Sequence, residues 1–370
     1  MHGWAFRLVP LAALLLAVVP AAREAAAVNG CFTPSAVASI TGTSTGSSAG
    51  ASVDDDSQAT AEVNDSNDAS SSAIATICSD ASARVDNSNS GMAAASAHDH
   101  SDSRAEVKDS PGGMATATAE DGSEAEATAE NSPYASVAAY ATGGIRATAR
   151  ATDSDYAGVY ANAEDFSEAH ATVENSNWGW ANAVASGSGN SFASAEVKDS
   201  TFGTAYASAH DFSQAEATVD DAYGAFAEAI ARLFSGAAAT ARGEGSSAVA
   251  RSRWFSEASA RADGDYAAAL GVSFGYSAAE ARSDDLGGYA LAFAGWFSEA
   301  AAYDGLALAF ILGEAEAEGG LAVAYFGGEA YGGQGVSCRG IAFAVSEDGS
   351  ETCLSKSPIL LIAKRIALVF

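Results

Sequence analysis

The chain has 370 residues and a formal net charge of −29, with 18 Lys and Arg against 47 Asp and Glu. This acidity excludes the basic surface of a nucleic-acid-binding protein and disfavours binding to anionic membranes. Alanine dominates the composition. Glycine contributes 37 residues and proline only 6, so neither collagen nor a proline-rich linker fits. Large aliphatic side chains are scarce between residues 50 and 220, which therefore cannot form a thick aliphatic core.

Residues 1–27 have the organisation of a secretory signal peptide. Arg7 precedes the apolar run 8–19, which is too short to span a bilayer comfortably, and 25–27 form an Ala-x-Ala cleavage site. A lipoprotein site at Cys31 is the alternative, disfavoured because two charged residues lie between the apolar run and this cysteine. We therefore expect an exported protein, secreted or held at the cell surface.

Four cysteines remain after the signal peptide, and an even number in an exported chain favours disulfides. Three pairings are possible, of which we favour Cys31–Cys78 and Cys338–Cys353, one near each end. The chain contains no Cys-x-x-Cys pair, so a zinc or redox site is poorly supported.

An internal repeat of about 22 residues runs through most of the chain. Its first marker is a serine usually followed by x-Ala-x-Ala-x-Val or Ala, at Ser57, Ser79, Ser101, Ser123, Ser167, Ser191, Ser213, Ser235, Ser256, Ser277 and Ser298. Its second marker is Asp or Asn, usually followed by Ser, at Asp65, Asn87, Asp109, Asn131, Asp153, Asn175, Asp199 and Asp221. A second alternating run follows each second marker, so one unit is strand, turn, strand, turn.

Alanine alternates with other residues in both runs, as in 115–119 and 205–209. A period of two is that of a β-strand with two distinct faces. Alanine favours helices intrinsically, but a helix would not keep an alternation that Asp-Ser, Gly or Asn interrupts every few residues. One unit buries only methyl groups and needs stacked neighbours to form a core. The sequence therefore predicts an all-β fold, a flattened two-sheet β-solenoid with ~22-residue coils and an Ala-lined core, whose sheets lie closer than the ~10 Å of ordinary stacked sheets.

The turns follow from the same pattern. The first-marker serines share the parity of the inward alanines, which predicts corner hydroxyls bonded to backbone groups. Asp and Asn at the second marker tolerate the left-handed conformation and form Asx turns.

We expect four segments along the chain: a signal peptide at 1–27, an N-terminal cap segment at 28–53, β-solenoid repeats at 54–332, and a disulfide-stapled hairpin with an apolar C-terminal cap at 333–370. The tail 358–370 is apolar but too short and too charged to span a membrane. We expect it to cover the open end of the solenoid, with contact to a membrane surface as the alternative.

The outward positions of the first strands are polar and of mixed sign. One column reads Glu62, Arg84, Glu106, Thr128, Arg150, Thr172, Glu196, Thr218, Thr240, Arg261 and Arg282. Opposite charges on neighbouring strands can pair, at ~0.2–1 kcal/mol each. We interpret this column as part of a solvated face, and a ligand-binding lattice is the alternative.

The outward positions of the second strands are different and become apolar toward the C-terminus. They include Tyr140, Tyr160, Tyr206, Ile230, Leu291 and Phe293. A row of exposed apolar side chains marks a candidate interaction face. The alternative is that the C-terminal tail or an adjoining segment covers it.

Aromatic residues recur in the second turn, at Phe166, Phe212, Phe234, Phe255, Tyr276 and Phe297, with Trp254 and Trp296 beside them. This spacing predicts a stacked edge. We favour stabilisation of the turn over a carbohydrate-stacking ridge.

Candidate chemistry is sparse. His98 and His100 could share a metal with Asp102, but a structural site needs four ligands held in place. The acidic turns 54–56, 263–265 and 284–285 leave weak Ca²⁺ binding open. No nucleophile elbow, phosphate loop, HExxH or dinucleotide fingerprint is present. We predict no catalytic residue, no cofactor site and no enzyme activity.

The stretch 28–353 resembles secreted Ala/Gly/Ser-rich proteins of actinobacterial type, which share Ala-x-Ala repeats and terminal cysteine pairs. The matching features here are Cys31, the Ala-x-Ala runs and Cys353-Leu354. No activity comes with this resemblance. The Ala-x-Ala phrasing is also similar to the head repeats of trimeric autotransporter adhesins, although the chain lacks their coiled-coil stalk and barrel anchor.

Together these patterns predict an exported, non-enzymatic β-solenoid with a structural or adhesive role at the cell surface or in the extracellular matrix. Its partner would be a surface glycan, matrix or a second copy of the chain, and not nucleic acid. The alternatives are an ice- or crystal-surface-binding protein, suggested by Thr116 and Thr118, and a polysaccharide-active β-helix enzyme.

Overall fold

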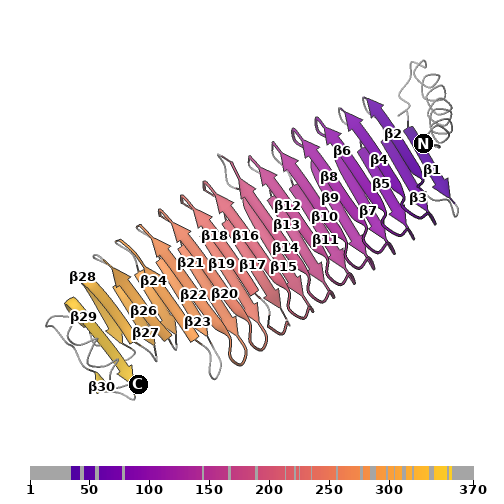
Figure 1. Ribbon diagram of the computed structural model, residues 1–370. Helices are drawn as coiled ribbons and strands as arrows, with labels where there is room; N and C mark the ends of the chain where they lie inside the picture. Colours follow the sequence, from indigo (N-terminus) through magenta and orange to yellow (C-terminus); the bar gives the residue numbers. More distant parts are fainter. Residues whose placement is uncertain are drawn as a thin grey trace, which may run out of the picture.

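The fold is seen in a computed structural model, and the secondary structure among its described residues is entirely β (Figure 1). The strands cross an elongated body whose colours run from indigo at one end to yellow at the other, so the chain advances steadily along it. The structure describes residues 35–41, 46–54, 58–76, 80–143, 146–165, 168–187, 191–212, 214–220, 222–224, 226–234, 236–255, 257–275, 278–283, 289–296, 299–303, 305–310, 314–318, 321–332, 337–347 and 350–351.

Two parallel sheets make up the body, because each strand pairs with the strand two places further along the chain. The odd-numbered sheet contains β1 (Ser35–Thr41), β3 (Gln58–Asn64), β5 (Asp80–Asp86), β7 (Asp102–Lys108), β9 (Glu124–Glu130), β11 (Arg146–Thr152), β13 (Glu168–Glu174), β15 (Phe192–Lys198), β17 (Gln214–Asp220), β19 (Gly236–Arg242), β21 (Glu257–Asp263), β23 (Ala278–Ser283), β25 (Glu299–Tyr303) and β27 (Glu314–Glu318). The even-numbered sheet contains β2 (Ser48–Asp54), β4 (Ser70–Thr76), β6 (Met92–His98), β8 (Met114–Glu120), β10 (Ser136–Thr142), β12 (Gly158–Glu164), β14 (Trp180–Ser186), β16 (Thr204–His210), β18 (Phe226–Arg232), β20 (Ser247–Arg253), β22 (Ala268–Phe274), β24 (Tyr289–Ala294) and β26 (Gly305–Phe310).

The last strands depart from this pattern. β28 (Leu321–Gly332) is long enough to pair with β26 through its first half and with β27 through its second half. β29 (Ser337–Glu347) then runs antiparallel to β28, and β30 (Ser350–Glu351) runs antiparallel to β29.

The predicted β-solenoid is confirmed by the register of these pairs. Ala59 lies beside Ala81, one repeat later in the sequence, and the same register continues from coil to coil. Where a coil is longer, as from Glu168 to Phe192, the additional residues fall in a turn and the strand register is kept. The spacing found in the sequence is therefore the length of one coil.

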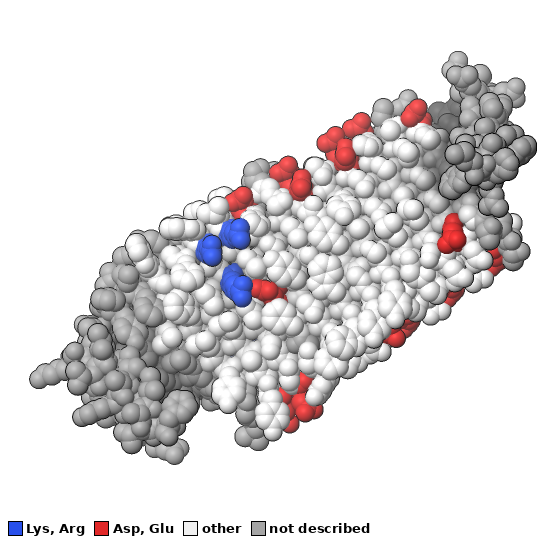
Figure 2. All heavy atoms as spheres, in the orientation of Figure 1, with Lys and Arg blue, Asp and Glu red and all other residues white. Residues whose placement is uncertain are grey.

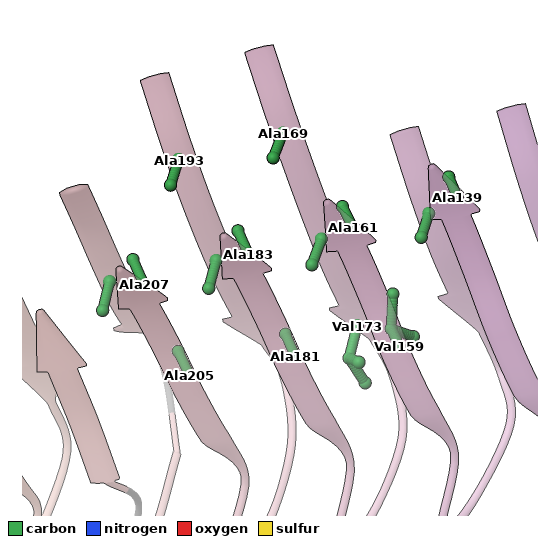
Figure 3. Packing of buried hydrophobic residues seen from close by; sticks show 14 of the residues in the cluster. Ala139, Val159, Ala161, Ala169, Val173, Ala181, Ala183, Ala193, Ala205 and Ala207 are labelled. Atoms are coloured by element: carbon green, nitrogen blue, oxygen red, sulfur yellow. The ribbon is translucent and has the colours of Figure 1, made fainter. Parts of the chain in front are cut away.

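The core lies between the two sheets and consists almost entirely of methyl groups. Ala59, Ala61 and Val63 on β3 are fully buried, and the same three inward positions recur on the following strands (Figure 3). At Gly271 on β22 an added Cβ would lie 2.4 Å from the backbone oxygen of Glu280 on the facing sheet. The sheets approach so closely there that a single methyl group does not fit. Alanine is therefore selected by the space available, which overrides its preference for helices.

Within one coil, larger and smaller core residues compensate each other. A Cβ added to Gly179 would lie 2.3 Å from Cγ1 of Val173, the last inward residue of the preceding strand. Gly113 stands in the same relation to Val107, at 2.3 Å. Where alanine replaces that valine, alanine also replaces the glycine, as in the pairs Ala129 with Ala135 and Ala151 with Ala157, all four buried. Two coils depart from this rule: Val63 coexists with buried Ala69, and in the sequence Val219 is followed by Ala225 at the equivalent position.

We predict that Gly179→Ala destabilises the protein by about 1–3 kcal/mol, because the new methyl group overpacks against Val173. Adding Val173→Ala recreates the arrangement of Ala151 and Ala157, so the double variant should be no less stable than Val173→Ala alone. Chemical denaturation of the three variants measures this coupling. Strictly additive losses would contradict the proposed contact.

From β3 to β15, the turn after each odd-numbered strand begins with Asp or Asn followed by a buried serine. The backbone of Asp65, Asn87, Asp109 and Asn131 is left-handed, with φ between 47° and 53°, which confirms the predicted conformation. Asn87 Nδ2 donates to Asp65 Oδ1 at 2.5 Å, so alternation of Asn with Asp replaces charge repulsion by a hydrogen bond.

The serines of this turn form a continuous buried column, which the alternation in the sequence does not predict. The Ser110 amide donates to Ser132 Oγ at 3.0 Å, and that hydroxyl donates to the Glu130 carbonyl at 2.8 Å. The same bonds link Ser132 to Ser154 and Ser154 to Ser176. Each hydroxyl therefore satisfies two backbone groups that the turn would otherwise bury without partners.

The corner hydroxyls predicted at the other turn are confirmed at Ser101 and Ser123, whereas the buried hydroxyl of Ser191 has no hydrogen-bond partner among the described residues. Ser101 and Ser123 are buried, and their hydroxyls donate to the carbonyls of His98 and Glu120, each at 2.6 Å. The Ser101 amide donates to Ser123 Oγ at 2.9 Å, which places the two serines on adjacent coils.

Several predictions fall on parts of the chain outside the described residues. They concern the signal peptide, Cys31, Cys78, Cys353, the side chain of Cys338 and the tail 352–370. In the segment 28–53, β1 and β2 pair in register with β3 and β4.

Candidate interaction face

The two sheets present very different outer faces. On the odd-numbered sheet the outward columns are those predicted: Glu62, Arg84 and Glu106 are neighbours in register. Charged side chains pair between coils, with Arg84 Nη1 3.4 Å from Glu106 Oε2 and Lys108 Nζ 3.2 Å from Glu130 Oε1. The hydrogen bond and the charge of Glu130 raise the pKa of Lys108. This face is a ladder of exposed ion pairs, each worth little in stability.

Glu168 is the carboxylate with the clearest perturbation on this face. It lies 2.8 Å from Arg146 Nη2 on the neighbouring strand and 3.4 Å from His170 Nε2. The Arg146 hydrogen bond, followed by that of His170, lowers the pKa of Glu168 from its usual 4.5. A lowered carboxyl pKa contributes stability above the unfolded-state pKa, and the contribution is lost as pH falls through the folded-state pKa.

We predict that Arg146→Gln raises the pKa of Glu168 toward its usual value, because the stronger partner is removed. His170→Gln should raise this pKa by less. A carboxyl ¹³C NMR titration of both variants measures the two shifts. Equal shifts, or none for Arg146→Gln, would contradict the assignment of the main partner.

The even-numbered sheet has an almost uncharged outer face. On its described strands from β4 to β24, the three outward columns nearest the first turn carry only Glu228 and Arg251 as charged residues. These two side chains pair at 3.0 Å between Glu228 Oε1 and Arg251 Nη1. Figure 2 shows this face: its centre is almost free of charged groups, which gather at the margins and in one small cluster. We call it the even-strand face.

The candidate residues named from the sequence all lie on strands of this face. Tyr140 and Tyr160 occupy adjacent strands with ring centroids 5.6 Å apart, and Tyr206 lies two strands beyond Tyr160. Burial, followed by the neighbouring Tyr140 and Glu164, raises the pKa of Tyr160. Ile230, Leu291 and Phe293 continue the strip along β18 and β24. The six residues therefore form a row along the body, not a cluster around one point.

Both edges of the solenoid carry stacked aromatic rings. At the second turn Phe234 stacks on Phe212 and on Phe255, with centroids 5.0 and 4.9 Å apart and interplanar angles of 3° and 4°. This confirms the predicted stack for these three residues; Phe166, Tyr276 and Phe297 lie outside the described residues. Because the stacked faces cover each other, a central ring such as Phe234 presents only its rim to solvent. This geometry favours stabilisation of the turn over sugar stacking, which needs a free ring face.

The first turn carries a second aromatic stack, which is not among the features predicted from the sequence. Tyr134, Tyr156, Trp178 and Phe202 have successive centroid distances of 5.1, 6.4 and 4.6 Å. All four have positive φ, between 55° and 62°. Their coil-length spacing was the signal that could have revealed them.

Substitution of Phe234 measures how far ring stacking offsets the strain of its left-handed backbone. Its φ is 57°, a conformation that costs a residue with a side chain ~1–2 kcal/mol, whereas each stacked pair contributes ~0.5–1.5 kcal/mol. We predict that Phe234→Ala, which loses both stacks and keeps the strain, destabilises the protein by about 1–3 kcal/mol. Phe234→Gly should be more stable than Phe234→Ala by about 1 kcal/mol. Denaturation midpoints measure both differences, and an alanine variant as stable as the wild type would show that the stack contributes nothing.

The candidate metal residues do not converge. His98 Nδ1 lies 2.9 Å from Glu120 Oε2, and the His100 ring occupies the space beside Gly122. In the acidic turn 263–265, Asp263 pairs with Arg261 at 3.0 Å. Within the described part of the chain no group of three His, Cys, Asp or Glu side chains could hold a metal ion.

The described residues also contain no helix with the length and hydropathy needed to cross a membrane. Comparisons of the chain with protein-family models, with curated proteins and with solved structures gave no match.

Proposed function

We propose that the protein is an exported, non-enzymatic β-solenoid with a structural or adhesive role at the cell surface or in the extracellular matrix, acting through the even-strand face. The observation that carries this proposal is the contrast between the two sheets. One outer face is a ladder of ion pairs, and the other is broad, regular and almost uncharged on a chain of net charge −29.

The outward side chains are arranged in rows along the solenoid and are not gathered around one position. This arrangement supports binding of an extended partner over catalysis at a single site. Side chains follow columns that run from coil to coil: Tyr140 and Tyr160 lie on adjacent strands of the even-strand face, and Tyr206 lies two strands further along. A regular flat face suits an extended or periodic partner, and exposed apolar side chains gathered on one face, such as Ile74, Tyr140 and Leu291, are typical of interaction sites.

Binding of the mature protein to immobilised polysaccharides and to matrix preparations tests the proposal. We expect retention by at least one of these surfaces, and loss of retention in the variant Val184→Glu/Ile230→Glu, which places two charges on the even-strand face. The control variant Thr172→Glu/Thr218→Glu, with the same charge on the odd-numbered sheet, should bind like the wild type. Equal loss in both variants, or release of sugars from a polysaccharide, would contradict the proposal.

A further inference from the structure

We infer that the partner of the even-strand face is a second copy of this chain, packed face to face with its long axis reversed. The inference rests on the proposed role of this face and names its partner. Three properties of the face support it: its area, its gradient of side-chain size and the signs of the charges along one margin.

The area is sufficient for a stable pair. Strands of seven residues at ~3.3 Å per residue, spaced by ~4.8 Å from β4 to β24, give a footprint of ~1,100 Å² on each copy. A specific protein–protein interface buries about 800 Å² per partner. Among the described strands, the three outward columns nearest the first turn, which we call the central columns, contain just one ion pair. Two such faces therefore meet without charge repulsion.

Side-chain size changes along the face. Toward the N-terminal end the central columns carry small side chains such as Ala94 and Ser96 on β6. Toward the C-terminal end they carry larger ones such as Leu270 and Val272 on β22. Two copies packed with parallel axes would set large against large at one end. Reversing one axis about β14 places Leu270 and Val272 over Ala94 and Ser96 of the other copy, and Phe293 on β24 over Ile74 on β4.

The margin next to the second turn carries opposite charges at its two ends. The last residue of each even-numbered strand lies there. Glu120 and Glu164 occupy this column in the N-terminal half, whereas Arg232 and Arg253 occupy it in the C-terminal half. Figure 2 shows red groups along the upper margin and blue groups toward the end of the body where the strands of highest number lie. The face therefore has a charge polarity that a reversed copy complements.

A twofold axis along β14 satisfies all three properties. It brings β8 of one copy over β20 of the other, and thus Glu120 over Arg253. It brings β12 over β16, so that Glu164 meets His210 and Tyr160 meets Tyr206 at the same position along the strand. Such an arrangement is isologous and closes at the dimer, because both copies use the same face.

Charge reversal in two complementary variants tests this arrangement by analytical ultracentrifugation of the mature chain from micromolar to millimolar concentration. We expect the wild type to dimerise. Arg232→Glu/Arg253→Glu gives glutamate at all four of these marginal positions, and Glu120→Arg/Glu164→Arg gives arginine at all four. Each variant alone should dimerise at least tenfold more weakly, whereas an equimolar mixture should recover dimers.

The matched control is Arg242→Glu/Arg261→Glu, which changes the net charge equally on the odd-numbered sheet and should dimerise like the wild type. Circular dichroism confirms that every variant keeps its β-structure. A wild type that stays monomeric would overturn the inference and leave the C-terminal segment or a glycan as the occupant of the face. Failure of the mixture to recover dimers, or equal weakening by the control, would also overturn it.

This test is independent of the surface-binding test. A monomer that binds polysaccharide through the even-strand face would refute the dimer and keep the proposed function. A dimer that binds no polysaccharide or matrix surface would support the dimer and refute the proposed binding to such surfaces.

Discussion

The close approach of two parallel sheets governs the rest of this structure. At Gly271 the facing backbone leaves no space even for a Cβ, and elsewhere the inward positions admit little beyond alanine. An alanine methyl contributes at most ~0.8 kcal/mol by burial, so hydrophobic stabilisation per coil is small. The backbone ladder from coil to coil and tight packing must therefore supply much of the cohesion, and a core this thin tolerates few changes in volume.

The turns follow from the same constraint. A flat coil has to reverse direction twice within a few residues, which forces left-handed backbone at Asp65, Asn87 and their equivalents. Their amides continue the ladder: the Asp65 amide donates to the Asp86 carbonyl at 3.2 Å and the Asn87 amide to the Lys108 carbonyl at 3.0 Å. Buried serine hydroxyls such as that of Ser132 form hydrogen bonds with the backbone amides and carbonyls of the turn that take no part in this ladder. Aromatic stacks at both edges then offset backbone strain where bulky residues occupy positive φ.

Much of this arrangement could be predicted from the sequence, because a period of two within a longer repeat determines both the coil and the direction of each side chain. The columns through Glu62 and through Tyr140 were predicted in register. The compensation between Val173 and Gly179 could not be predicted in this way, since it depends on how the chain folds back across a turn. The buried Ser132 column was missed because the turn interrupts the alternation from which burial was inferred. The charge polarity from Glu120 to Arg253 became visible only when the strand ends were aligned along one margin.

Distances between labels placed in one outward column test the central claim most directly. Nitroxides can be attached through a bioorthogonal amino acid at Thr60 and Thr148 in one sample, and at Thr60 and Glu216 in another, leaving the cysteines unchanged. These pairs are separated by four and seven coils in the observed register. At ~4.8 Å per coil, pulsed electron paramagnetic resonance should give distances of ~19 and ~34 Å. Distances that do not increase by ~14 Å between the two samples would contradict a solenoid of stacked, in-register coils.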